Sequence, residues 1–88
     1  MRTVIESPEV SAKIDAACAR YPRAEDAIEA AKWWLARRPE SGYLMDDINW
    51  LYRQKGDSAV GIPVLLIVYT FDHRSVTISS IEIRMSTV

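Results

Sequence analysis

Few side chains of the types that most often do chemistry occur in this 88-residue chain. There is one histidine, His73, and one cysteine, Cys18. Zinc sites take most of their ligands from these two residue types, so the sequence predicts no metal site and no cofactor. The adjacent acids Asp46 and Asp47 could touch a hard cation, but neighbouring side chains on a strand point to opposite faces. Any chemistry would therefore depend on residues that the fold brings together.

The charge of the chain is nearly balanced. Eleven Lys and Arg stand against twelve Asp and Glu, which gives a net charge of -1. Residues 39–88 carry four basic and six acidic side chains, a net charge of -2 (4 minus 6) in the part expected to form a sheet. Attraction to nucleic acid depends on summed positive charge, so the composition gives no general pull toward RNA or DNA.

The length and the apolar runs indicate one cytoplasmic domain that spans residues 1–88. A chain of this size buries enough surface for one core only. The longest apolar run, residues 64–69, is far too short to span a bilayer, and the N-terminal residues lack the apolar core of a signal peptide. We therefore expect no membrane partner.

The first half of the sequence predicts a strand followed by two helices. Residues 2–6 contain a β-branched trio that suits a short strand. Ser7 and Pro8 are typical of a helix start, and Pro22 must end that helix. A second helix follows with acidic residues in its first turn and Arg37 and Arg38 in its last. Its apolar stripe consists of Ala24, Ala27, Ile28, Ala31, Trp34 and Leu35, with Trp33 near the edge of the stripe.

The second half predicts strands. Residues 43–55 fit both a helical and a strand period, and we interpret Ile48 to Gln54 as a strand and residues 55–61 as a loop. Val64 to Phe71 is a continuous apolar run typical of a central strand. Residues 72–75 form a turn. In the last strand the apolar residues change parity, which predicts a bulge near Ser79 and Ser80.

The elements together define an α+β fold in β-α-α-β-β-β order. The short connection between the helices predicts an antiparallel helical hairpin. We expect that hairpin to pack on one face of a small, mainly antiparallel sheet.

Two segments carry a resemblance to a known family. They are the helix end WWLARRPESG (residues 33–42) and the closing hairpin PVLLIVYTFDHRSVTISSIEIR (residues 63–84). With the element order, they resemble the RelE/ParE toxin superfamily of bacterial type II toxin-antitoxin systems. The resemblance implies a toxin-like protein with a cognate antitoxin-like partner.

The resemblance also implies candidate site residues. Ribosome-dependent members of the family cut messenger RNA without a metal, using basic residues and a tyrosine on the sheet, whereas ParE-type members act on DNA gyrase and lack that set. Cleavage by a ribose 2'-hydroxyl needs proton transfer and cations that stabilise the phosphorane. The corresponding cations here are Arg53, Lys55 and Arg84, with Arg74 in the turn between the last strands. Tyr69 or His73 would transfer protons.

Each of these side chains has a simpler interpretation. The cations and His73 suit a solvated surface, and Tyr69 suits the core. Because residues 39–88 are acidic overall, we expect a ParE-like toxin, or one without messenger RNA cleavage. The alternative is a non-catalytic protein-interaction module whose contact surface contains Trp33 or Trp50. A homodimer formed through an uncovered sheet edge is a third possibility.

Overall fold

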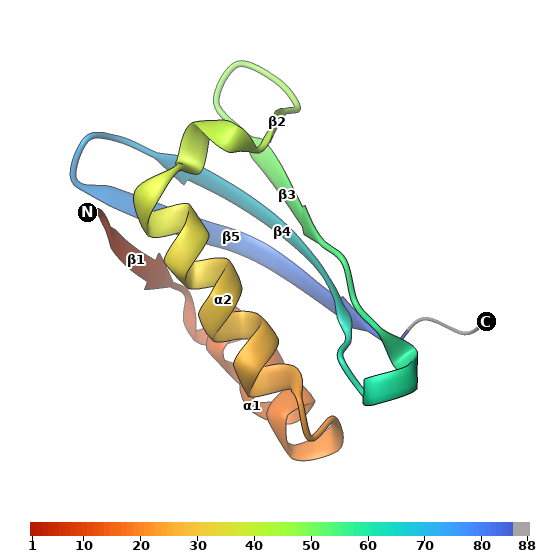
Figure 1. Ribbon diagram of the computed structural model, residues 1–88. Coiled ribbons are helices and arrows are strands. Elements are labelled where there is room, and N and C mark those ends of the chain that lie inside the picture. The colour runs from red at the N-terminus through yellow and green to blue at the C-terminus, as the bar shows by residue number, and fades with distance from the viewer. Residues whose placement is uncertain (86–88) are drawn as a thin grey trace.

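The computed structural model describes residues 1–85 and has an α+β fold, as the sequence predicts (Figure 1). The elements, in chain order, are β1 (Thr3–Glu6), α1 (Pro8–Arg20), α2 (Ala24–Arg37), β2 (Tyr43–Leu44), β3 (Trp50–Gln54), β4 (Val64–Phe71) and β5 (Ser75–Arg84). Single 3-10 turns, Pro39–Ser41 and Ser58–Val60, precede β2 and β4.

The five strands form one mixed sheet in the order β1-β5-β4-β3-β2. β1 pairs with β5 in parallel, and the other pairs are antiparallel. The sheet has one strand more than the predicted order, because Tyr43 and Leu44 pair with Leu51 and Trp50 to form β2. A two-residue strand is too short to show a periodicity of its own.

The predicted start of the strand Ile48–Gln54 is wrong. The Asp46 carboxylate accepts hydrogen bonds of 2.9 Å from the backbone N–H groups of Ile48 and Asn49, and the Met45 N–H donates to the Asn49 carbonyl. These bonds make residues 46–49 a tight turn. β3 therefore begins at Trp50, and the Ile48 side chain lies outside the core, 66% exposed.

The predicted helix ends agree with the structure. The Ser7 hydroxyl oxygen accepts a 3.2 Å hydrogen bond from the Val10 N–H, and Pro8 is the first residue of α1. α1 ends at Arg20, two residues before Pro22. The helices run in opposite directions in Figure 1, α1 away from β1 and α2 back toward the N-terminal end.

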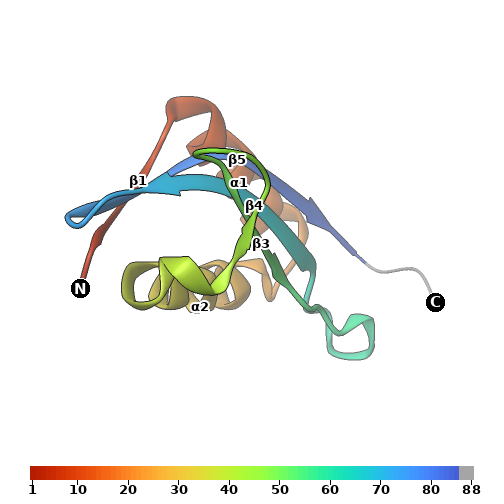
Figure 2. The same cartoon turned by 90° about the horizontal axis from the view of Figure 1, so that it is seen from above.

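The core lies between the two helices and one face of the sheet. It contains Val10, Ile14 and Ala17 of α1, Ala24, Ala27, Ile28, Ala31 and Leu35 of α2, Leu65, Ile67 and Tyr69 of β4, and Val76, Ile78 and Ile81 of β5. Trp34, which we placed in the apolar stripe, is 43% exposed. The buried alanines bring α2 close to the sheet (Figure 2), and the wide Trp34 ring remains at the rim, edge-on against Trp33.

The predicted bulge in the last strand is present. Val68 pairs with Ser80 and Tyr69 pairs with Ile78, so Ser79 has no partner residue on β4. The Ser79 hydroxyl donates to the Val68 carbonyl oxygen at 3.2 Å. One extra residue changes the parity of the strand, and Ile78 and Ile81 consequently face the same core.

Candidate functional site

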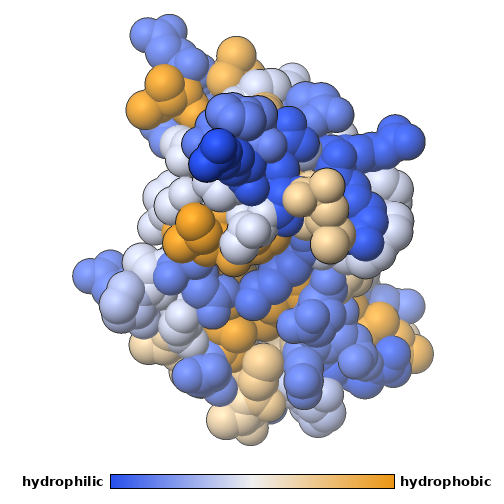
Figure 3. All heavy atoms as spheres, turned by 90° about the vertical axis from the view of Figure 1, so that its left-hand side faces the viewer, coloured by the Kyte–Doolittle hydropathy of each residue, from blue (hydrophilic) through white to orange (hydrophobic). Residues whose placement is uncertain are grey.

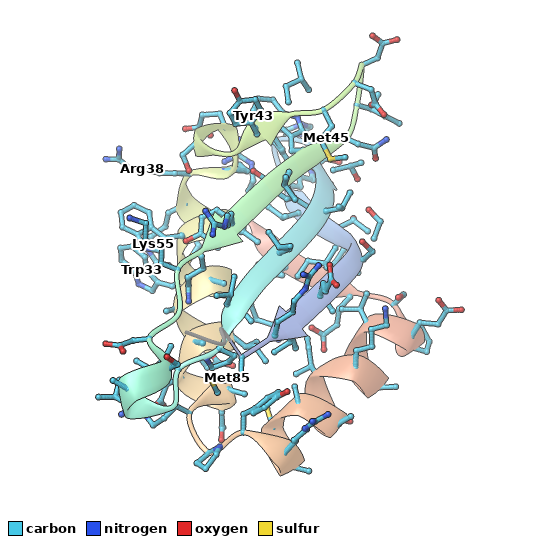
Figure 4. All side chains as sticks on the ribbon, turned by 90° about the vertical axis from the view of Figure 1, so that its right-hand side faces the viewer. Trp33, Arg38, Tyr43, Met45, Lys55 and Met85 are labelled. Atoms are coloured by element: carbon cyan, nitrogen blue, oxygen red, sulfur yellow. The ribbon has the colours of Figure 1, made fainter. Side chains whose placement is uncertain are left out.

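The sheet face that points away from the helices is the surface on which the predicted catalytic cations should gather. Figure 4 looks onto this face, with α2 behind the strands and α1 at the lower right, beside the end of β5. Along β4, the buried Leu65, Ile67 and Tyr69 alternate with Val64, Leu66 and Val68, which are half-buried. The centre of the helix-free face is thus aliphatic.

Arg53 and Arg84 both lie on the helix-free face. Arg53 pairs with Leu66, and Leu66 pairs with Glu82, so one row across the sheet joins the three residues. The Arg84 guanidinium contacts the Glu82 carboxylate at 2.7 Å and 2.9 Å. The hydrogen bond between them raises the pKa of Arg84 and lowers the pKa of Glu82. A phosphate at this place would compete with Glu82 for Arg84.

Tyr69 lies on the opposite face of the sheet, in the core. Its side chain is 0% exposed, and its hydroxyl donates a hydrogen bond to the Pro39 carbonyl oxygen. Burial raises the pKa of Tyr69 to about 12. Strand β4 therefore separates the tyrosine from Arg53 and Arg84, because alternate residues of a strand point to opposite faces.

The remaining candidates lie at the two ends of the sheet. Lys55 follows β3, at the edge of the sheet (Figure 4). His73 and Arg74 are exposed in the β4–β5 turn, at the opposite end of β4. The Asp72 carboxylate holds this turn by accepting from the N–H groups of Arg74 and Ser75 at 2.7 Å and 2.8 Å. The structure thus brings Arg53 and Arg84 onto one face, with Lys55 two residues beyond Arg53, and leaves Tyr69 in the core and His73 and Arg74 at the other end of the sheet.

Arg53 also lines a hollow beside residues 52–54 of β3, which do not pair with β2. The other lining residues are Ser41, Gly42, Tyr43, Leu51 and Tyr52. Gly42 separates this hollow from the core, since a Cβ atom added to it would lie 2.1 Å from the Tyr69 hydroxyl oxygen. The hollow offers one guanidinium and an aliphatic and aromatic wall, which suits binding rather than proton transfer.

The two predicted contact tryptophans differ in exposure. Trp33 is 50% exposed, with the Arg37 guanidinium 4.1 Å from its ring centre and Trp34 edge-on at 5.2 Å. Trp50 is half-buried and packs against Phe71, with the two ring centres 5.3 Å apart. Trp33 is therefore the one whose ring is available at the surface.

Two surface features were not found by the sequence interpretation. One is the hairpin of residues 43–49, called the β2–β3 arm here, whose Tyr43, Leu44, Met45 and Ile48 side chains are exposed. The other is a groove between α1 and the end of β5, called the α1–β5 groove. The apolar residues on both sides of Asp46-Asp47 were the only signal for the arm. The groove gave no such signal, because it is formed by two segments, residues 13–21 and 81–83, that are far apart in the sequence.

The face of the molecule on the β1 side is different in character. Figure 3 shows hydrophilic side chains over most of it, with hydrophobic ones in separate places.

Among residues 1–85, no three His, Cys, Asp or Glu side chains are close enough together to hold a metal ion. In the same part of the chain, neither helix has the length and apolar character needed to cross a membrane.

Comparisons with known protein families, curated proteins and solved structures give no match.

Proposed function

We propose that the chain is a toxin-like component of a type II toxin-antitoxin system that acts in the cytoplasm by binding proteins and does not cleave messenger RNA. The observation that carries the proposal is the separation of Tyr69 from Arg53 and Arg84 on opposite faces of the sheet. A general acid or base must lie within hydrogen-bond reach of the proton that it moves. The Tyr69 hydroxyl is instead occupied by the Pro39 carbonyl.

The arrangement of elements supports the toxin-like class. The strand, helical pair and closing hairpin occur in the order that the family resemblance implies, and both helices contribute to one core on one sheet face. The opposite face is left for a partner. Its aliphatic centre is bordered by Arg53 and Arg84, so a partner segment with apolar and acidic side chains matches it in polarity and charge.

Protein targets fit this surface better than RNA does. The chain has a net charge of -1, and Glu82 on the same sheet face pairs with Arg84 at 2.7 Å. A long phosphate backbone would meet too few unpaired cations on this face. A ParE-like action on DNA gyrase follows from the family resemblance and not from the net charge.

Induced expression in bacteria tests the proposal. We expect growth to stop and DNA supercoiling to change while messenger RNA stays intact, and co-expression of a cognate antitoxin-like protein to restore growth. Arg53→Ala should weaken the effect, and Arg23→Ala, at the start of α2, should not. Normal growth, translation and supercoiling, with no binder encoded nearby, would contradict the proposal.

A non-catalytic interaction module is the second candidate, and the exposed Trp33 favours it. The ring is held between Arg37 and Trp34, and an ordered exposed aromatic of this kind is a frequent centre of protein contacts. If this function is correct, expression of the parent chain should not affect growth. Trp33→Ala should abolish co-purification of the partner protein that the parent chain binds. Trp50→Phe, which keeps the ring that packs on Phe71, serves as the control.

A further inference from the structure

We propose that the chain forms a closed two-fold dimer in which the β2–β3 arm of each copy docks into the α1–β5 groove of the other. This inference is independent of the proposed function. It rests on an arm and a groove whose apolar surfaces and charges complement each other.

The arm exposes more apolar surface than an isolated chain usually tolerates in one place. Tyr43 is 78% exposed, Leu44 53%, Met45 55% and Ile48 66%. These four side chains lie within six consecutive positions, at one end of the molecule. Scattered apolar residues are common on surfaces, but a contiguous group marks a contact site.

The arm is also ordered before it meets a partner. The Asp46 carboxylate accepts from the N–H groups of Ile48 and Asn49, and the Asn49 side-chain amide donates to both of its oxygens. The Met45 N–H closes the turn on the Asn49 carbonyl at 2.8 Å. An ordered hairpin loses little conformational entropy on docking. Asp47 is exposed beside it and contributes a second carboxylate at the tip.

The groove offers the opposite charge above an apolar floor. One stripe of α1 supplies Lys13, Ala16, Ala17 and Arg20, at the i, i+3, i+4, i+7 spacing of a helix face. The alanines leave space between α1 and the end of β5, where Ile81 and Ile83 lie. Tyr21 and Glu82 complete the lining.

The charges in the groove favour an acidic occupant. Lys13 and Arg20 are both exposed. The acidic residue of the lining, Glu82, is paired with Arg84 at 2.7 Å, which offsets its charge. The tip of the arm carries Asp46 and Asp47, so an arm in the groove would place two carboxylates near two cations.

The positions of the arm and the groove allow both contacts to form at once. In Figure 1 the arm lies at one end of the molecule and the body of α1 lies toward the other. In Figure 4 both lie toward the right of the view, the arm at its top and α1 at its lower end. A two-fold axis across the 36 Å long dimension places each arm against the other copy's groove. Such a contact closes on itself and does not extend into filaments.

Sedimentation equilibrium of the purified chain tests the dimer, and a charge exchange tests its geometry. The first variant is Asp47→Lys; Asp46 is kept because it holds the turn. The second is Lys13→Glu with Arg20→Glu. In the first variant the arm loses its net negative charge and the new ammonium group faces Lys13 and Arg20; in the second, the groove becomes acidic like the arm. We expect dimerisation of each variant alone to weaken by about tenfold or more.

An equimolar mixture of the two variants provides the decisive measurement. In the mixed pair, the unchanged arm of one copy meets the unchanged basic groove of the other, and the lysine of the altered arm meets the acidic groove, so the mixture should dimerise better than either variant alone. Ile48→Ser should weaken the dimer, and Val60→Ser, which replaces an exposed apolar side chain on the loop before β4, should not. Far-UV circular dichroism confirms that each variant is folded. A chain that is monomeric up to millimolar concentration, or a mixture that stays monomeric, would overturn the proposal.

Discussion

At the scale of single residues, Tyr69 shows how a side chain with chemical potential is used for packing. Its ring lies in the core and its hydroxyl reaches the Pro39 carbonyl, which follows directly on the C-terminal end of α2. The side chain thereby connects the central strand to the segment that turns toward β2.

Removal of the Tyr69 hydroxyl should therefore lower stability. We expect Tyr69→Phe to reduce the free energy of unfolding by roughly 1–2 kcal/mol, because the buried Pro39 carbonyl would lose its donor. Urea denaturation at neutral pH measures the change. Tyr43→Phe, at a position that is 78% exposed, is the matched control and should change stability very little. Equal effects of the two substitutions would contradict this role.

The same hydroxyl predicts a loss of stability at high pH. Burial raises the pKa of Tyr69 to about 12, so the folded state holds its proton more tightly than the unfolded state, whose tyrosine titrates near pH 10. The stabilisation is complete below about pH 10 and disappears as the pH rises toward about 12, by roughly 2–3 kcal/mol in all. The difference in unfolding free energy between the parent chain and Tyr69→Phe, followed from pH 9 upward by urea denaturation, should therefore shrink and then change sign, because this loss exceeds the roughly 1–2 kcal/mol difference at neutral pH.

Residue types alone could predict that Tyr69 belongs to the core, but not the distribution of the cations. The apolar neighbours of Tyr69 in sequence made burial the simpler interpretation. Arg84 and Glu82 contact each other because they lie two residues apart on one strand and so point to the same face. Arg53 lies in one row with Glu82 because of the register of three strands. Register involves pairings across the sheet that a single sequence does not encode locally.

At the scale of elements, the bulge at Ser79 determines which side chains of β5 face the core. Residues before it and after it face the helices although their parity in the sequence differs. The one extra residue thus allows both halves of β5, the longest strand, to point their apolar side chains toward the core.

Deletion of Ser79 should be far more damaging than its substitution. Without the extra residue, one half of β5 must turn its isoleucines outward, and we expect a loss of more than roughly 3 kcal/mol or failure to fold. Ser79→Ala removes only the hydrogen bond to the Val68 carbonyl and should cost less than about 1 kcal/mol. Thermal unfolding followed by circular dichroism compares the two. A stable deletion variant would show that the bulge does not set the facing of β5.

Elements with strong local signals were predictable and the β2–β3 arm was not. Ser7, Pro8 and Pro22 fix the helix boundaries through backbone geometry, and the bulge is visible in the changed parity of the isoleucines. The arm depends on the Asp46 carboxylate capping two N–H groups, which competes with the strand period of Ile48 and Trp50. Local hydrogen bonds therefore overrode the pattern on which the strand assignment depended.

At the scale of the whole molecule, Glu6 joins the first strand to both helices. Its carboxylate contacts the Lys32 ammonium of α2 at 3.0 Å and accepts from the Ser11 hydroxyl of α1 at 2.9 Å. Burial alone would raise the pKa of Glu6, but the ion pair with Lys32 and the hydrogen bond from Ser11 outweigh it and hold the pKa below its ordinary value.

Stability should consequently depend on Glu6 at neutral pH and not at acid pH. A depressed pKa in the folded state means that the stabilisation is present above the usual range of glutamate and is lost as the pH falls through the folded pKa. We expect Glu6→Gln to lower the unfolding free energy by about 1 kcal/mol at pH 7 and to have almost no effect near pH 2. Glu29→Gln, at an exposed position of α2, is the control. A loss that is the same at both pH values would exclude the ionic contribution.

The parallel pairing of β1 with β5 also determines when this chain can fold during its synthesis. β1 is made well before the residues that it pairs with, since Thr3 pairs with Ser75, 72 residues later (75 minus 3). The central β4, against which the helices pack, also follows them by many residues. While the ribosome is still translating the chain, the apolar sides of α1 and α2 therefore have no sheet to cover. The native fold can form only after β5 has been made, and until then these apolar sides are open to non-native contacts.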